Sequence, residues 1–166
     1  MEGAFFEILS SLLRMPLQAQ ALIHGSQTHP DLTGNVYFYP LWNGTFIIAE
    51  IENLPLSSQI CDGKIFGFHI HAGSQCLDNG DGPFGTTGSH FNPDNCLHPS
   101  HAGDLPPLFA DEGYALSMFY TGRFYPEEVI GKTAVIHDMP DDFTSQPSGN
   151  SGAKIACGEI TPAVVP

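Results

Sequence analysis

The sequence of 166 residues predicts an all-β sandwich or barrel. Seven short segments are rich in β-branched and aromatic residues, and Gly, Pro and Asn separate them as turn residues separate strands. No helical periodicity follows residue 16, and several strands without helices are typical of sandwiches and barrels. The predicted strands fall within residues 17–25, 34–40, 44–55, 64–73, 113–124, 131–139 and 152–160.

The N-terminal stretch differs from the rest of the chain. Its apolar residues repeat at helical spacing and predict a short amphipathic helix that ends before Pro16: Phe5, Ile8, Leu9, Leu12 and Leu13. We therefore expect an N-terminal helical extension, residues 1–16, and one domain, residues 17–166. Glu2 and Glu7 stand where a secretory signal carries Lys or Arg, which predicts a cytoplasmic protein. Four cysteines fit that compartment poorly, because stable disulfides are rare in the cytosol.

The net charge and the hydropathy of the chain bear on whether it binds nucleic acid or a membrane. The chain has a net charge of −13 and only five Lys and Arg residues, so it lacks the basic surface that neutralises phosphates. No apolar run approaches the ~20 residues of a membrane-spanning helix. We therefore expect neither nucleic acid nor a membrane as a partner. An aromatic sheet face could support a homodimer, although the sequence shows none.

The segment GFHIH places His69 and His71 two residues apart in a predicted strand. Side chains at i and i+2 of a strand point to the same face, about 7 Å apart. Two imidazoles on one face suit metal chelation, since imidazole is the commonest metal ligand. Two solvated histidines on the exposed side of a strand are the alternative.

Two long gaps interrupt the strands, from about Ala72 to Leu108 and from about Asp138 to Gly152. Loops beyond roughly 12–15 residues are uncommon unless they are functional or disordered. The first gap holds Phe84, Phe91, two cysteines and three histidines, which is not a disordered composition. Metal ligands or a disulfide are the natural ties for this loop.

Six histidines cluster around the two gaps, and Asp104 lies three residues after one of them. Together they supply the seven or eight ligands that a site for two metal ions needs. The histidines are His69, His71, His90, His98, His101 and His137.

The motifs GFHIH, GSHFNP, HAGD, AVIHDMPDD and GNSGAKIACG occur in the order found in the copper,zinc superoxide dismutases, which the chain resembles over residues 18–160. The resemblance implies an eight-stranded Greek-key β-barrel with two long functional loops, an architecture that this family shares with the β-sandwiches. It implies dismutation of superoxide to oxygen and hydrogen peroxide by Cu(II)/Cu(I) cycling.

The resemblance also implies the roles of individual residues. His90 would bridge both metals and take a proton in the reduced state, Asp141 would link a copper histidine to a zinc histidine, and Cys76 and Cys157 would form a disulfide. One copper would be bound by His69, His71, His90 and His137, and one zinc by His90, His98, His101 and Asp104.

Three departures from the family pattern bear on the rate. Lys154 stands where the family usually has the arginine that guides the anion, and lysine keeps the charge but loses the forked donor geometry. His98 and His101 are only three residues apart, closer than the family's usual spacing, which bears on whether His98 reaches zinc. The second gap has no lysine to steer superoxide. We expect salt-dependent turnover that is slower than diffusion.

Two other functions stay open from the sequence. The first is a copper- or zinc-storage or chaperone-like protein with little dismutase activity, and the second is an interaction domain with a purely structural metal. Copper-dependent turnover separates dismutation from both. Cys61 and Cys96 have no role in the resemblance, and a second disulfide or two thiols are both open.

Overall fold

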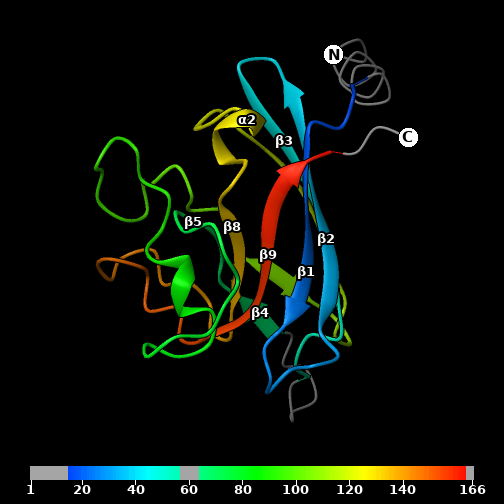
Figure 1. Ribbon diagram of the computed structural model, residues 1–166, viewed down its shortest axis with the longest axis vertical. Helices are drawn as coiled ribbons and strands as arrows, with labels where there is room; N and C mark the ends of the chain where they lie inside the picture. The colour runs from blue at the N-terminus through cyan, green and yellow to red at the C-terminus, as the bar shows by residue number, and fades with distance from the viewer. Residues whose placement is uncertain (1–14, 57–63, 164–166) are drawn as a thin grey trace.

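The computed structural model describes residues 15–56 and 64–163, so the predicted N-terminal helix and Cys61 lie outside the described residues. Within those ranges the chain forms nine strands and two short helical turns (Figure 1). They are β1 (Ala19–Gly25), β2 (Thr33–Leu41), β3 (Gly44–Glu52), β4 (Lys64–Phe66), β5 (Phe68–His71), the 3-10 turn η1 (Gly85–Thr87), β6 (Leu108–Ala110), β7 (Ala115–Thr121), α2 (Pro126–Val129), β8 (Thr133–His137) and β9 (Lys154–Pro162).

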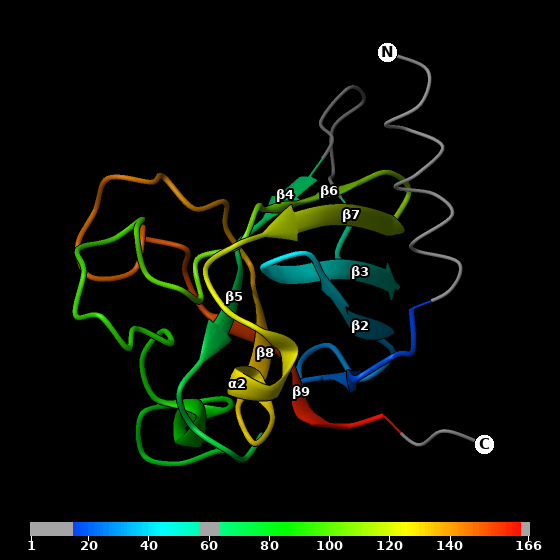
Figure 2. The same ribbon diagram turned by 90° about the horizontal axis from the view of Figure 1, so that it is seen from above.

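The strands form one large curled sheet and one small sheet. The large sheet has seven strands in the order β5-β8-β9-β1-β2-β3-β7, and β4 pairs with β6 in a separate two-stranded sheet. All pairings are antiparallel. Only Gly67 separates β4 from β5, so one segment of chain joins the small sheet to the edge of the large one, as the view from above shows (Figure 2). If β4 and β5 are counted as one interrupted strand, the structure confirms the predicted eight-stranded barrel.

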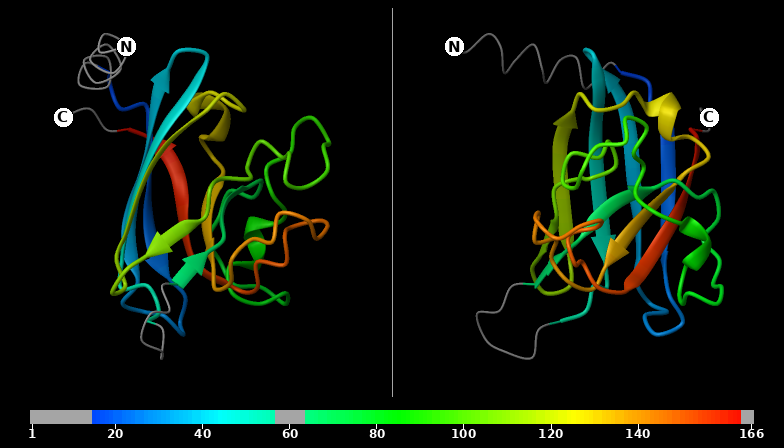
Figure 3. Two further views of the ribbon diagram at one scale, coloured as in Figure 1. Left: turned by 180° about the vertical axis from the view of Figure 1, so that it is seen from behind. Right: turned by 90° about the vertical axis from the view of Figure 1, so that its left-hand side faces the viewer.

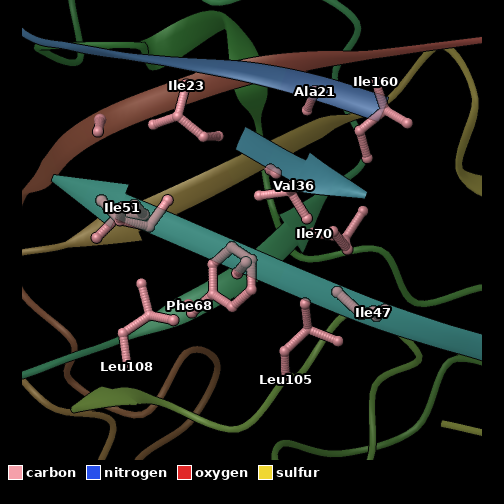
Figure 4. Packing of buried hydrophobic residues seen from close by; sticks show 14 of the residues in the cluster. Ala21, Ile23, Val36, Ile47, Ile51, Phe68, Ile70, Leu105, Leu108 and Ile160 are labelled. Carbon is pink, nitrogen blue, oxygen red and sulfur yellow. The ribbon is translucent and has the colours of Figure 1, made fainter. Parts of the chain in front are cut away.

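The core fills the space enclosed by the curled sheet. Side chains from opposite walls point toward one another between β1, β3, β5 and β9 (Figure 4). Val36, Ile47, Phe68 and Ile70 are all 0% exposed. Burying a side chain of this size contributes about 1.5–3 kcal/mol each, so this packing stabilises the wall that carries the histidines of β5.

Three elements were not expected from the sequence: η1, β6 and α2. The strand β6 is only three residues long and follows Pro106 and Pro107, so it lacks the alternation that identifies a strand. The helix α2 is a single turn with Pro126 at its first position and Glu127 and Glu128 in its first turn, which are helix-start signals too short to predict an element. Among the helices of the described ranges, none is long and apolar enough to span a bilayer.

The two predicted long loops lie together on one side of the barrel. They run between β5 and β6 and between β8 and β9, and the views of Figures 1, 2 and 3 all place them next to each other beside β5 and β8. The first loop returns to β5 through the backbone bonds Ile70 N–H to Gly103 O and Phe91 N–H to Ile70 O, at 2.9 and 2.7 Å. Gly103 permits this approach, because a Cβ there would lie 2.3 Å from the Ile70 carbonyl oxygen. The backbone of the loop is therefore fixed where its histidines must face β5.

A disulfide fastens the same loop to the last strand. Cys76 in the loop is bonded to Cys157 in β9, 81 residues further along the chain, and both residues are buried. Cys157 packs with Val135 and Phe84, so the bond lies in a small apolar cluster of its own. The pairing implied by the resemblance is confirmed.

Replacing Cys76 with Ser should lower the free energy of unfolding by about 2–5 kcal/mol, since a crosslink of this span removes much of the chain entropy of the unfolded state. Urea unfolding of the metal-free protein measures the change. Cys96→Ser is the matched control, because Cys96 is an exposed free cysteine and its replacement should leave the unfolding free energy unchanged. Equal stability of the two variants would contradict this role of the disulfide.

Candidate metal centre

Two groups of side chains converge between β5, β8 and the first long loop. The four-histidine group consists of His69, His71, His90 and His137, and the aspartate group of His90, His98, His101 and Asp104. In each group one nitrogen or oxygen from every residue lies within 4.8 Å of the others. His90 belongs to both groups. The structure therefore brings together all seven residues to which the resemblance assigned a metal.

The strand geometry explains how three of the histidines meet. His69 and His71 are alternate residues of β5, so both rings leave the same face while Phe68 and Ile70 enter the core. His137 ends β8, which pairs with both β5 and β9, and the register with β9 shifts between Ile136 and His137. Such an irregularity turns a side chain relative to the strand. The His137 ring thereby lies 5.4 Å from the His71 ring, centroid to centroid.

Backbone carbonyls hold the rings of His71 and His137. His71 Nδ1 lies 2.8 Å from Gly88 O in the first loop, and His137 Nδ1 lies 3.3 Å from Gly152 O in the second. A carbonyl only accepts, so each Nδ1 carries the proton and each Nε2 is left with its lone pair. The two Nε2 atoms lie 3.3 Å apart. The first loop therefore orients His71 Nε2, and the second loop orients His137 Nε2, toward the same point.

Asp141 connects the two groups by contacting one histidine ring in each. Its Oδ2 lies 2.8 Å from His69 Nε2, its Oδ1 lies 2.9 Å from His98 Nε2, and it is 5% exposed. The carboxylate accepts a hydrogen bond from Nε2 of each ring. This fixes the tautomers and leaves both Nδ1 atoms free to bind a metal. This contact links the two histidines that the resemblance assigned to copper and to zinc.

Asp104 organises the aspartate group. Its Oδ1 lies 2.7 Å from His90 Nδ1, and its Oδ2 accepts the backbone N–H of His101 at 2.9 Å. His98 Nδ1 and His101 Nδ1 lie 3.1 and 3.2 Å from the same carboxylate. The shortened spacing between His98 and His101 therefore does not keep His98 out of this group.

Four buried ring nitrogens form no hydrogen bond within the described part of the chain: His69 Nδ1, His90 Nε2, His98 Nδ1 and His101 Nδ1. The last two are close to the Asp104 carboxylate but are not hydrogen-bonded to it. A buried polar atom without a partner costs about 1–3 kcal/mol, so four in one place call for a common partner. Neutral imidazole nitrogens and a carboxylate are metal donors. The residues present fit metal ions in both groups.

Burial keeps three histidines of the four-histidine group in the neutral form that binds metal. Desolvation, with repulsion from neighbouring His90 and His137, lowers the pKa of His69 to about 2. Desolvation lowers the pKa of His137 to about 4 and that of His71 well below 6.5. For Asp104, burial raises the pKa, but the hydrogen bonds from His90 and from the His101 N–H prevail and lower it to about 2. At neutral pH the site offers imidazole lone pairs and one carboxylate.

Lys154 lies beside the four-histidine group at the edge of a cavity of about 490 Å³ that His71 and His137 also line. Its Nζ donates to Thr87 Oγ1 at 2.8 Å and lies 3.4 Å from the carbonyl oxygens of Phe84 and Gly88. Burial lowers the pKa of Lys154, and the charge of Asp81 opposes that shift. The ammonium therefore lines the cavity near His71 and His137 and is held by the first loop.

Three side chains around the site carried no signal in the sequence. Thr87 binds Lys154, Gln146 hydrogen-bonds both backbone groups of His98, and Arg123 lies against three carbonyls of the loop that carries His101 and Asp104. Their partners are mainly backbone atoms, which every residue has, so no spacing rule could have identified them.

In the metal-free protein, the free energy of unfolding should fall as the pH drops from about 6.5 toward 4. The unfolded state binds protons at the ordinary histidine pKa of 6.5, whereas folded His137 binds one only near pH 4, so acid favours unfolding. The shift of His137 alone corresponds to about 3 kcal/mol. Denaturant unfolding at a series of pH values measures it; a flat profile over this range would show that these rings are not buried in neutral form.

Comparison with known proteins agrees with the geometry. Residues 32–160 match the family described as copper/zinc superoxide dismutase (SODC). The chain is 37% identical over 146 residues to Cu-Zn superoxide dismutase A of Xenopus laevis, covering 78% of this chain and 89% of the relative. It is 34% identical over 157 residues to Cu-Zn superoxide dismutase 1 of Aquifex aeolicus, covering 81% and 87%, and 31% identical over 145 residues to that of Deinococcus radiodurans, covering 76% of both. The protein belongs to the copper/zinc superoxide dismutase family.

Proposed function

We propose that the protein is a superoxide dismutase, which converts two superoxide radicals and two protons into dioxygen and hydrogen peroxide. We assign one copper ion to the four-histidine group and one zinc ion to the aspartate group. The observation that carries the proposal is the position of His90, whose ring belongs to both groups. Its Nε2 is buried without a partner and its Nδ1 lies 2.7 Å from Asp104.

The donor sets differ in the way that the two metals require. Four imidazole nitrogens suit copper, and three imidazoles with one carboxylate suit a closed tetrahedral zinc site. Copper held by the four histidines would supply the electron transfer of both half-reactions. The remaining work falls to the chain itself, which must orient the ligands, deliver protons and admit the anion.

The proton chemistry centres on His90. The Nε2 atom of His90 has no partner in the described residues, so it would hold one of the two protons that dismutation consumes. Asp104, 2.7 Å from Nδ1 of the same ring, would keep the ring in place while Nε2 changes its protonation. Asp141 and the carbonyls of Gly88 and Gly152 fix the other rings, so they would stay aimed at the same point.

The substrate would enter through the cavity beside Lys154. That cavity leads to His71, His90 and His137, and the Lys154 ammonium supplies positive charge at the same opening. A protein of net charge −13 repels an anion at long range, so the local charge must guide it over the last few ångströms. Storage or chaperone-like metal binding is not favoured, because curated relatives over most of the chain are named superoxide dismutases.

Protein loaded with copper and zinc should consume superoxide rapidly, and His69→Ala should reduce turnover by more than about 100-fold, since even contacts behind the ligands cost 10–100-fold. Superoxide decay after pulse radiolysis, with metal content measured in parallel, tests this. His24→Ala is the matched control, because His24 is an exposed histidine of β1. Full metal content with negligible turnover in the wild type would instead support a storage protein.

The cytoplasmic location and the homodimer stay predictions.

Lys154→Gln should lower kcat/KM by about tenfold at low salt and weaken its dependence on ionic strength. The charge is present below the pKa of Lys154 and lost above it, so wild-type activity should fall as the pH rises, with a midpoint below 10.5. Lys154→Arg should move that midpoint upward, and Lys154→Gln should abolish it. Identical pH and salt profiles for wild type and Lys154→Gln would show that the ammonium does not guide the substrate.

A further inference from the structure

The ligand loop, residues 98–104, is a short segment that carries three members of the aspartate group. It supplies His98, His101 and Asp104, with only two residues between each pair. Within the loop, Asp104 N–H lies 3.2 Å from His101 O, and the Asp104 carboxylate accepts the His101 N–H. These contacts shape one turn but do not fix it against the barrel. The main hydrogen bonds from its backbone to other parts of the chain are made with β5, Arg123 and Gln146.

The guanidinium of Arg123 contacts three backbone carbonyls of the ligand loop. It follows β7, and its Nη1 lies 3.1 Å from Pro99 O, 3.0 Å from His101 O and 3.2 Å from Asp104 O. Three carbonyl oxygens that converge on one point repel one another unless a cation lies between them. Hydrogen bonds from a charged donor are about twice as strong as neutral ones. One guanidinium thus determines where the backbones of two zinc ligands lie.

Gln146 holds the first ligand of the loop. Its Oε1 accepts the His98 N–H at 3.0 Å and its Nε2 donates to the His98 carbonyl at 2.7 Å, so one amide satisfies both backbone groups of His98. Asp141, five residues earlier in the same second loop, holds the ring of His98. The second loop therefore fixes both the backbone and the ring of this ligand.

We propose that Arg123 and Gln146 are positioning residues that hold the ligand loop in its zinc-binding geometry. The inference rests on the proposed assignment of zinc to the aspartate group. Neither residue offers a donor to a metal ion, since a guanidinium has no lone pair to give and the Gln146 amide is engaged by His98. Their effect on zinc passes through the carbonyls and the N–H that they hold.

Electrostatics separates positioning from a general effect of charge. A positive guanidinium beside a site for a divalent cation repels the cation, so its removal should strengthen zinc binding if charge alone mattered. Gln146→Glu adds a negative charge and should likewise strengthen binding on charge alone. Positioning predicts the opposite sign for both variants, because each loses hydrogen bonds to the loop.

The experiment measures zinc affinity by competition with a chelator, in protein whose four-histidine group is already filled with copper. Arg123→Gln and Gln146→Glu should each weaken zinc binding by about 10–100-fold, the usual effect of losing a contact that orients a ligand. Arg123→Lys should recover part of the affinity, because an ammonium has three donors for the three carbonyls. Lys64→Gln on β4 is the control for charge and should leave zinc affinity unchanged.

Two further readouts keep the result interpretable. Copper affinity should change by less than about twofold in every variant, which shows that the barrel has folded and that the loss is specific to the aspartate group. Cobalt(II) placed in the zinc site should lose the strong visible absorption of a tetrahedral ion in Arg123→Gln and regain it in Arg123→Lys. A folded variant with a distorted ligand loop gives this combination.

Unchanged or tighter zinc binding in both Arg123→Gln and Gln146→Glu would overturn the inference. If the wild type binds zinc and dismutes superoxide while the variants retain full zinc affinity, only the positioning role fails. If the wild type takes up no zinc at the aspartate group, the proposed zinc assignment and the inference fail together. If Arg123→Gln fails to fold, Gln146→Glu, whose side chain lies on the exposed second loop, decides alone.

Discussion

Six imidazole rings are buried between one wall of the barrel and the first long loop, and much of the surrounding structure follows from keeping them correctly turned. Desolvation prevents His69, His71 and His137 from taking protons at neutral pH. Neutral rings still need a donor or acceptor fixed at one nitrogen so that the other faces the metal. Asp141 and two loop carbonyls provide these partners for His69, His98, His71 and His137, which is why both long loops must be anchored against β5 and β8.

This arrangement makes the metal-free protein carry a cost that the rest of the fold must offset. Four unpaired ring nitrogens at about 1–3 kcal/mol each are comparable with the whole net stability of a small domain. The apolar core and the Cys76–Cys157 bond lie directly behind the site, where they resist any relaxation that would expose the rings. Metal binding removes the unpaired atoms, so the metal ions and the fold stabilise each other.

The sequence predicts what depends on periodicity or on a family motif. Alternation in a strand placed His69 and His71 on one face, and the family motifs identified the remaining residues of the two groups and the disulfide. The strand β6 was missed because three residues after two prolines carry no alternation. Arg123 and Gln146 were missed for a different reason: they bind backbone groups, and a backbone carbonyl leaves no trace in the residue types. The shortened spacing of His98 and His101 counted against His98 as a member of the zinc group, whereas the structure holds His98 in that group through Gln146 and Asp141.

The substitution of lysine for arginine at position 154 has a geometric consequence. A lysine ammonium has three protons, and Lys154 Nζ already has three oxygen atoms of the first loop within 3.4 Å. Few donors remain to bind superoxide directly, whereas an arginine fork could hold the loop and the anion together. We therefore expect the residue to act mainly as a fixed positive charge in the lining of the cavity. Thr87, 0% exposed and itself bonded to Phe84 O, determines where that charge lies.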